Sequence, residues 1–158
     1  MSLEKHKEIL SQIEYSYNNE NYALANTGLF SVIDSLCGYF VKNNCTYRKN
    51  MFESIIEAEK KKSNDYIHIL ILSMVNSNIN FLYRKDQTTH KLARRHLSQH
   101  GESFSNNKID TILLLHTTYY LLICVEHYKE YAGKLVLDEK NKKYKNNKKY
   151  IIKDVKNK

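Results

Sequence analysis

The sequence predicts an all-α protein, an up-and-down bundle of long helices with a short extra helix and a lysine-rich C-terminal tail. The chain has 158 residues with no proline and only four glycines, so its helices meet few breakers. Apolar residues recur at helical spacing in several segments separated by short polar runs. The length predicts one domain, large enough to bury a core without disulfides or metal.

The expected helices alternate with polar turns. A cluster of asparagines at 18–21 separates the first two helices, and three lysines at 60–62 suit the C-terminus of the third. Asn64 or Asp65 caps the fourth helix, which ends before Arg84, and 105–107 offers a cap for the last. The expected spans are 3–17, 22–41, 47–60, a helix after Asn64 or Asp65, a short helix from Thr88 or Thr89, and 109–131 with Gly133 as its stop.

Apolar stripes at helical spacing run along the expected helices, and we expect them to face the core. The stripe of the last helix includes His116 and His127, which we interpret as hydrogen-bonded core or interface histidines. The fourth-helix stripe is Ile67, Leu70, Ile71, Met74, Val75, Asn78 and Phe81, and the last-helix stripe is Ile109, Ile112, Leu113, His116, Tyr120, Ile123, Cys124 and His127.

The positive charge is concentrated after residue 133. The net charge of the chain is +8, and residues 134–158 hold ten lysines against three acidic residues, a net of +7. We therefore divide the chain into a helical bundle, 1–133, and a basic tail, 134–158. The tail either attracts a polyanion or is a solvated end with biased composition. Residues 134–137 and 150–152 either pair as a weak hairpin or form a frayed end.

The cysteines and the apolar runs predict a cytoplasmic protein. Cys37, Cys45 and Cys124 are odd in number and far apart, so neither a disulfide framework nor a zinc cage is expected. The first residues contain no apolar signal region. The most apolar run, 112–125, is interrupted by polar residues and is too short to span a bilayer, so no membrane partner is expected.

One stretch, residues 92–104, concentrates the acid–base and phosphate-binding chemistry of the chain. It places Arg94, Arg95, His96 and His100 just ahead of Gly101. Arginine offers a rigid fork of donors for phosphate oxygens, and histidine exchanges protons near neutral pH. Together these residue types suggest chemistry on a phosphodiester.

Helix geometry leaves alternatives open for these side chains. On a straight helix Arg95 and His100 lie about 140° apart, so they converge only if the helix ends near residue 98 or 99. The same cations could simply complement the negative end of a helix before a glycine cap. His96 and His100 share a helical face, but they lack the glutamate of the zinc-protease motif and a clear third ligand, so we predict no metal there.

A carboxylate in the second helix is the remaining candidate. Asp34 interrupts an otherwise apolar segment. It either faces solvent or orients a catalytic arginine or histidine.

The motif Arg95-His96-x3-His100-Gly101-Glu102-Ser103 resembles the Arg-x4–6-His signature of the HEPN superfamily. It is most similar to the Arg-His-x3-His-Gly-Glu-Ser form found in HEPN-type proteins of bacterial genomes, often linked to phage defence. The run 29–36, with its Ile-Asp pair, is similar to an early helix of that group. The resemblance extends to about Tyr131, and the tail has no counterpart in it.

The resemblance implies metal-independent RNA cleavage without a cofactor. His100 would be the general base or acid on the ribose 2′-hydroxyl, Arg95 would stabilise the phosphorane-like transition state, and His96 would relay a proton or contact a phosphate. Arg94, Ser98, Gln99 and Asp34 would line the substrate site, whereas Glu102 would be a solvated loop residue. HEPN proteins usually form two-fold dimers, so a homodimer is implied.

The expected function is therefore a HEPN-type endoribonuclease, the toxin or effector of a bacterial defence or toxin–antitoxin system. Its partners would be substrate RNA, a second copy of the chain, and an antitoxin or regulatory protein. The alternative is a non-catalytic HEPN-type module that binds RNA, a nucleotide or a protein within a larger assembly.

Overall fold

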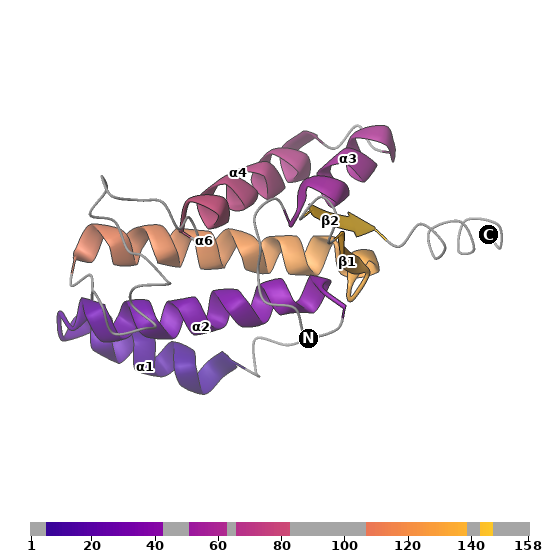
Figure 1. The fold of residues 1–158 in the computed structure, drawn as a ribbon. Helices are drawn as coiled ribbons and strands as arrows, with labels where there is room; N and C mark the ends of the chain where they lie inside the picture. Colours follow the sequence, from indigo (N-terminus) through magenta and orange to yellow (C-terminus); the bar gives the residue numbers. More distant parts are fainter. Residues whose placement is uncertain (1–5, 43–50, 63–65, 83–106, 139–142, 147–158) are drawn as a thin grey trace.

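The protein is an all-α helical bundle with one small hairpin, as the sequence predicted (Figure 1). The computed structural model describes residues 6–42, 51–62, 66–82, 107–138 and 143–146. The described elements are α1 (Lys7–Asn18), α2 (Tyr22–Phe40), α3 (Glu53–Lys62), α4 (Tyr66–Leu82), α6 (Lys108–His127), the 3-10 helix η2 (Lys129–Tyr131), β1 (Leu135–Asp138) and β2 (Lys143–Asn146). The expected short helix from Thr88 or Thr89 lies outside these residues.

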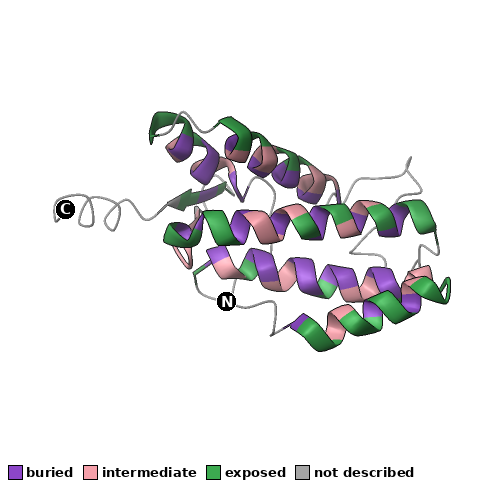
Figure 2. Ribbon diagram, turned by 180° about the vertical axis from the view of Figure 1, so that it is seen from behind, coloured by how far each residue is buried: buried purple, intermediate pink, exposed green. Residues whose placement is uncertain are grey.

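The long helices alternate in direction along the chain, so the bundle is up-and-down. In Figure 1, α2 and α6 lie side by side and run the same way, while α1 packs on α2 and α4 on α6 with the opposite direction. The core lies between them, and Figure 2 shows buried residues along the inner sides of α2, α4 and α6. Among its fully buried side chains are Leu29, Phe30, Ile33, Leu36, Phe40, Phe52, Leu72, Ile79, Leu114 and Leu121.

Helix α1 approaches α2 closely at Gly28. A Cβ atom added to Gly28 would lie 2.7 Å from Ile13 Cγ1, well inside van der Waals contact. Gly38, later in the same helix, has open space where its Cβ would be. The first glycine is therefore required by packing and the second is not.

The buried faces of α4 and α6 differ from those that the apolar stripes predicted. In α4 the predicted core residues Ile67, Leu70 and Met74 are exposed, and in α6 so are Ile109 and Ile112. The buried residues are Ile69, Leu72, Val75, Asn76, Ile79 and Leu82 in α4, and Asp110, Thr111, Leu114, Thr117, Thr118, Leu121, Cys124 and Val125 in α6, and they share only Val75 and Cys124 with the predicted stripes. The prediction was wrong because both helices are apolar on nearly every side, so periodicity cannot select one face.

The length and composition of helix α6 are relevant to the predicted cytoplasmic location of the protein. The run expected to be too short for a bilayer belongs to a 20-residue helix that is, by length and composition, long enough to cross one. Of its most apolar window, 44 % is buried inside the bundle, where α6 packs on α2 and α4. A buried core helix of a soluble protein has the same composition, so a soluble protein is compatible with this finding.

The C-terminal hairpin is attached to the bundle. Strands β1 and β2 pair antiparallel, with Leu135 opposite Asn146, and Lys42 N donates to Leu135 O at 3.0 Å. Leu135 and Tyr144 are buried. The second strand is thus 143–146 rather than the expected 150–152, which lies outside the described residues. Pairing of β1 with 143–146 closes a shorter loop than pairing with 150–152, and closing a shorter loop costs less conformational entropy.

Candidate functional site

The central motif falls in the connection between α4 and α6. Arg94, Arg95, His96, Ser98, Gln99 and His100, together with Gly101 and Glu102, lie outside the described residues. The structure therefore shows where this connection begins and ends. It leaves α4 after Leu82, which is buried, and enters α6 at Asn107. Two adjacent helices thus hold both ends of the motif-bearing segment.

The entry into α6 is fixed by a cap. Asn107 is extended, and its Oδ1 accepts from the backbone N–H of Ile109 at 2.8 Å. The hydroxyl of Thr111 donates to Asn107 O at 3.2 Å. The sequence predicted a cap within 105–107, and Asn107 forms it. The start of α6 is therefore fixed by local hydrogen bonds.

Asp110, in the first turn of α6, is a carboxylate that sequence analysis missed. It is fully buried, three residues after the cap and ten after His100. A negative charge there is stabilised by the positive end of the helix. Burial of a carboxylate costs free energy unless it is compensated, and Asp110 is thus an unusual buried acidic residue close in sequence to the motif.

Asp110 begins a row of polar groups along the buried face of α6. Thr117 and Thr118 donate their hydroxyls to Leu113 O and Leu114 O, each at 2.8 Å. Asn78 of α4 donates to Thr117 Oγ1 at 3.4 Å, which links the two helices. We call the set Asn26, Asn76, Asn78, Asp110, Thr111, Thr117 and Thr118 the polar seam. Its sequence signal was the i, i+7, i+8 spacing of Asp110, Thr117 and Thr118 on one face.

The polar seam makes the packing of α4 and α6 specific. Asn76 is buried, and its Oδ1 accepts no hydrogen bond within the part of the chain that the structure describes. Displacing α4 from α6 would instead break the hydrogen bond from Asn78 to Thr117. The two helices that hold the motif segment are consequently fixed against each other by more than apolar contacts.

Asp34 lies at the edge of the buried face of α2. Its side chain is half-buried, whereas Phe30 and Cys37, one turn before and after it, are fully buried. Asp34 is thus neither fully exposed to solvent nor part of the buried core.

Three histidines line a groove at the other end of α6. The groove has a volume of about 760 Å³ and includes His6, His68 and His127 among its lining residues. The rings of His68 and His127 stack 3.6 Å apart with an angle of 3° between their planes. At its rim, Lys129 Nζ lies 2.7 Å from Glu126 Oε2, which lowers the pKa of Glu126 and raises that of Lys129.

The sequence-based interpretation allowed His116 and His127 to be either core or interface residues, and the structure excludes the core for both. His116 is exposed on α6, so it is not a core residue. His127 is also exposed, and its partner is His68 of α4. Across the residues that the structure describes, no three His, Cys, Asp or Glu side chains are arranged to hold a metal ion.

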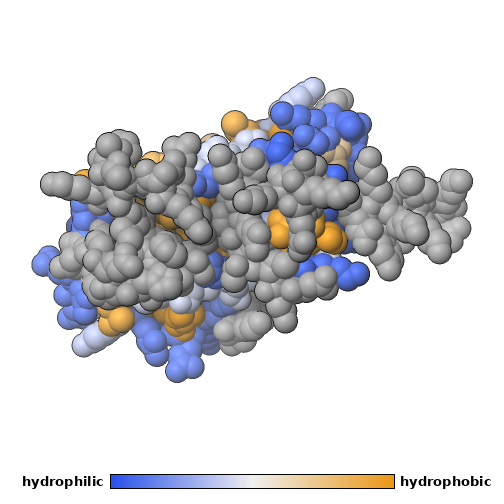
Figure 3. All heavy atoms as spheres, in the orientation of Figure 1, coloured by the Kyte–Doolittle hydropathy of each residue, from blue (hydrophilic) through white to orange (hydrophobic). Residues whose placement is uncertain are grey.

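Near the hairpin, a buried network joins α3 to η2. Tyr131 donates its hydroxyl to Glu59 Oε1 at 2.6 Å, and Lys62 lies 3.6 Å from the same carboxylate oxygen. Burial and this hydrogen bond raise the pKa of Tyr131. Lys62 also contacts Glu130 at 3.2 Å. The hydrophilic residues of α3 gather at the upper right of Figure 3, well separated from the start of α6 in Figure 1.

Comparisons with known proteins leave the family open. A scan against protein-family models found no match, and searches of curated proteins and of solved structures found none either. Any function must therefore be argued from the residues and the fold.

Proposed function

We propose that the protein is a metal-independent endoribonuclease of the HEPN type, acting as the toxin or effector of a bacterial defence or toxin–antitoxin system. The observation that carries the proposal is the Arg95-x4-His100 motif, which lies in the connection between two adjacent antiparallel helices of an all-α bundle. The bundle supports the proposal because the HEPN resemblance implies that class of fold.

The proposed reaction needs no external reagent. The 2′-oxygen of a ribose attacks the adjacent phosphorus, and the bond to the 5′-oxygen of the next nucleotide breaks. His100 exchanges a proton as general base or acid, with His96 as a second relay. Arg95 stabilises the charge that develops on the phosphoryl oxygens. The products are a 2′,3′-cyclic phosphate and a free 5′-hydroxyl.

The remaining site residues are assigned to substrate binding and positioning. Arg94, Ser98 and Gln99 contact the RNA backbone in this proposal. Asp34, half-buried on α2, orients one of the motif cations. The buried Leu82 and the Asn107 cap fix the two helix ends between which the motif segment lies.

The proposed assembly is a cytoplasmic homodimer. Two copies would bring two motifs to one RNA, so a body with little net charge could still neutralise several phosphates. An antitoxin or regulatory protein would control the activity. These partners follow from the same proposal and are tested with it.

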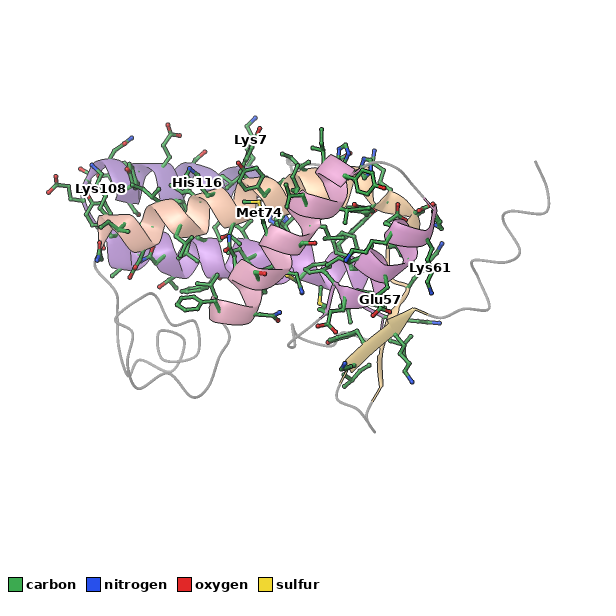
Figure 4. All side chains as sticks on the ribbon, turned by 90° about the horizontal axis from the view of Figure 1, so that it is seen from above. Lys7, Glu57, Lys61, Met74, Lys108 and His116 are labelled. Atoms are coloured by element: carbon green, nitrogen blue, oxygen red, sulfur yellow. The ribbon has the colours of Figure 1, made fainter. Side chains whose placement is uncertain are left out.

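The nuclease proposal is tested by incubating wild type, Arg95→Ala and His100→Ala with total RNA in EDTA. Lys61→Ala is the control, because it removes one exposed cation far from the motif in the sequence (Figure 4). Wild type and Lys61→Ala should cleave, and the two motif variants should lose at least about 100-fold in rate while keeping their helical circular dichroism. Loss of all cleavage in EDTA would contradict the metal-free mechanism.

Binding separates the proposal from its alternative. A non-catalytic HEPN-type module would retain RNA in a filter-binding assay without cleaving it, and the motif variants would change affinity alone. Cleavage by wild type with binding retained in His100→Ala supports the nuclease.

A further inference from the structure

The groove at the C-terminal end of α6 has the dimensions of a site for a small molecule. Its volume of about 760 Å³ lies within the range of about 300–1,000 Å³ that is usual for ligand pockets. Six of the ten described residues that line it belong to α6, and the others are His6, Leu36 of α2, His68 of α4 and Lys129. Figure 4 shows α6 between the start of α1, at Lys7, and α4, at Met74.

The apolar part of the groove is held in place by the core. Leu36 is fully buried and Val125 is 3 % exposed, so the packing of α2 on α6 fixes this part of the lining. The four aliphatic lining residues are Leu36, Leu122, Ile123 and Val125. A concave surface of this kind favours a ligand whose body is apolar, because binding removes apolar area from water on both sides.

The groove also presents aromatic rings. His68 and His127 stack with their centroids 3.6 Å apart and an angle of 3° between their planes. Tyr119 lines the same groove and is 60 % exposed. It precedes His127 by eight residues, which corresponds to about 12 Å along the axis of α6. Flat rings stack on one another and on aliphatic surface, and this length accommodates two or three fused rings.

The charges of the groove cancel. Glu126 and Lys129 are the two acidic or basic side chains, apart from histidine, in the described lining, and their Oε2 and Nζ atoms lie 2.7 Å apart. A charged ligand would therefore meet an opposing charge that is already paired. A neutral imidazole still offers one hydrogen-bond donor and one acceptor.

Sugars and nucleotides do not suit this lining. Within the described part of the groove there is no Ser, Thr, Asn or Gln side chain. A ligand with many hydroxyl groups would lose its hydrogen bonds to water without replacing them, which costs free energy. The lining thus selects against such ligands and in favour of a mostly apolar ring system.

We propose that this groove binds an uncharged, planar aromatic molecule of two or three fused rings with one or two hydrogen-bonding groups. The rings lie on the aliphatic lining beside Tyr119, and an imidazole of the histidine stack takes the polar group. The inference does not rest on the proposed nuclease. The groove contains none of the motif residues, and its occupancy is measured without RNA.

The test is a ¹H–¹⁵N NMR titration of the full chain with 2-naphthol, a neutral two-ring probe. The amide shifts should saturate with a Kd on the order of 1 mM or lower, as expected for a ligand of this size. They should be largest at Leu36, His68 and residues 119–129. Decahydro-2-naphthol has the same skeleton without aromatic rings and should bind about 10-fold more weakly. Naphthalene-2-sulfonate and AMP, which are charged, should also bind more weakly.

Two variants locate the site. Tyr119→Leu keeps an apolar side chain but removes the ring, so it should weaken 2-naphthol binding about 10-fold. Ile123→Trp places a large side chain in the groove and should abolish binding. His116→Leu is the control, because His116 is exposed on α6 outside the described lining (Figure 4), and it should leave the Kd unchanged. Circular dichroism must show native helix content in all three.

Several results would overturn the proposal. A wild type without saturable shifts for 2-naphthol would show that the groove is not a ligand site. Equal affinity for decahydro-2-naphthol would show that the groove does not select flat rings. Tighter binding of naphthalene-2-sulfonate or AMP would show that it selects an anion or a nucleotide. Unchanged affinity in both groove variants would place the ligand elsewhere.

Discussion

Replacing Gly28 by alanine tests the closest helix contact in the bundle. In an open helical position this change stabilises a protein by about 0.5–1 kcal/mol. At Gly28 the new methyl group would lie 2.7 Å from Ile13 Cγ1 and 3.1 Å from Ile13 Cδ1. Ile13 is itself buried, and forcing a group into packed space costs about 1–3 kcal/mol. The clash exceeds the propensity gain, so we expect a net loss of about 1 kcal/mol.

Two further variants make the reasoning refutable. Gly38→Ala lies in the same helix with open space around its Cβ, so it should gain about 0.5 kcal/mol. In an Ile13→Ala background the clash is absent, and Gly28→Ala should change from destabilising to stabilising. Urea denaturation followed by circular dichroism measures all three differences. If Gly28→Ala is as stable as Gly38→Ala in the wild-type background, α1 does not pack on α2 as described.

Three shorter predictions concern the far end of the bundle and the tail. Tyr131→Phe leaves the buried Glu59 carboxylate without its 2.6 Å hydrogen bond, so urea denaturation should show a loss of about 1–3 kcal/mol; no loss would mean that water replaces the hydroxyl. Burial raises the pKa of Cys124 from 9.0 to about 12, so its contribution to stability is complete below pH 9 and is lost as the pH rises toward 12. Relative to Cys124→Ala, wild type should lose up to about 4 kcal/mol over that range, and parallel stability curves would contradict the burial. Charge reversal of the lysines within 140–149 should reduce the salt dependence of RNA binding, and an unchanged slope would show that they are only solvated.

The helices could be predicted from the sequence because their boundaries carry local signals. The polar cluster before Tyr22, the cap at Asn107 and the stop at Gly133, with φ +62°, all appear in the structure. Helix α6 ends earlier than expected, at His127, and continues as the 3-10 turn η2. Helix-breaking and capping residues act within a few positions of a helix end, so their effect on the helix boundary does not depend on the tertiary arrangement.

The buried faces could not be predicted, because α4 and α6 offer two apolar sides. Only packing decides which side is inside, and it selected the side that carries Asp110, Thr117 and Thr118. The predicted stripes were chosen by counting apolar residues. Polar residues that can hydrogen-bond to each other within the core were not considered. The pairing of β1 with 143–146 also depended on tertiary contacts, here with α2 and α3.

The sequence indicated which residues could form the candidate site, but it did not indicate how they are arranged in space. Arg95 and His100 stand out by residue type and spacing, and they lie outside the described residues. Asp34 was singled out because it interrupts an apolar segment, and it lies at the margin of the core. Asp110 was overlooked because a carboxylate in a first helical turn is normally a solvated one.

The most direct test of the nuclease proposal is a single RNA of defined sequence with one 2′-deoxy nucleotide at a mapped cut site. The mechanism requires the 2′-hydroxyl as nucleophile, so wild type should cleave the all-ribose strand in EDTA and leave a 2′,3′-cyclic phosphate. The strand with the 2′-deoxy substitution should resist at that position and be cut at others. Cleavage at the substituted position at an undiminished rate would contradict the mechanism and the roles assigned to Arg95 and His100.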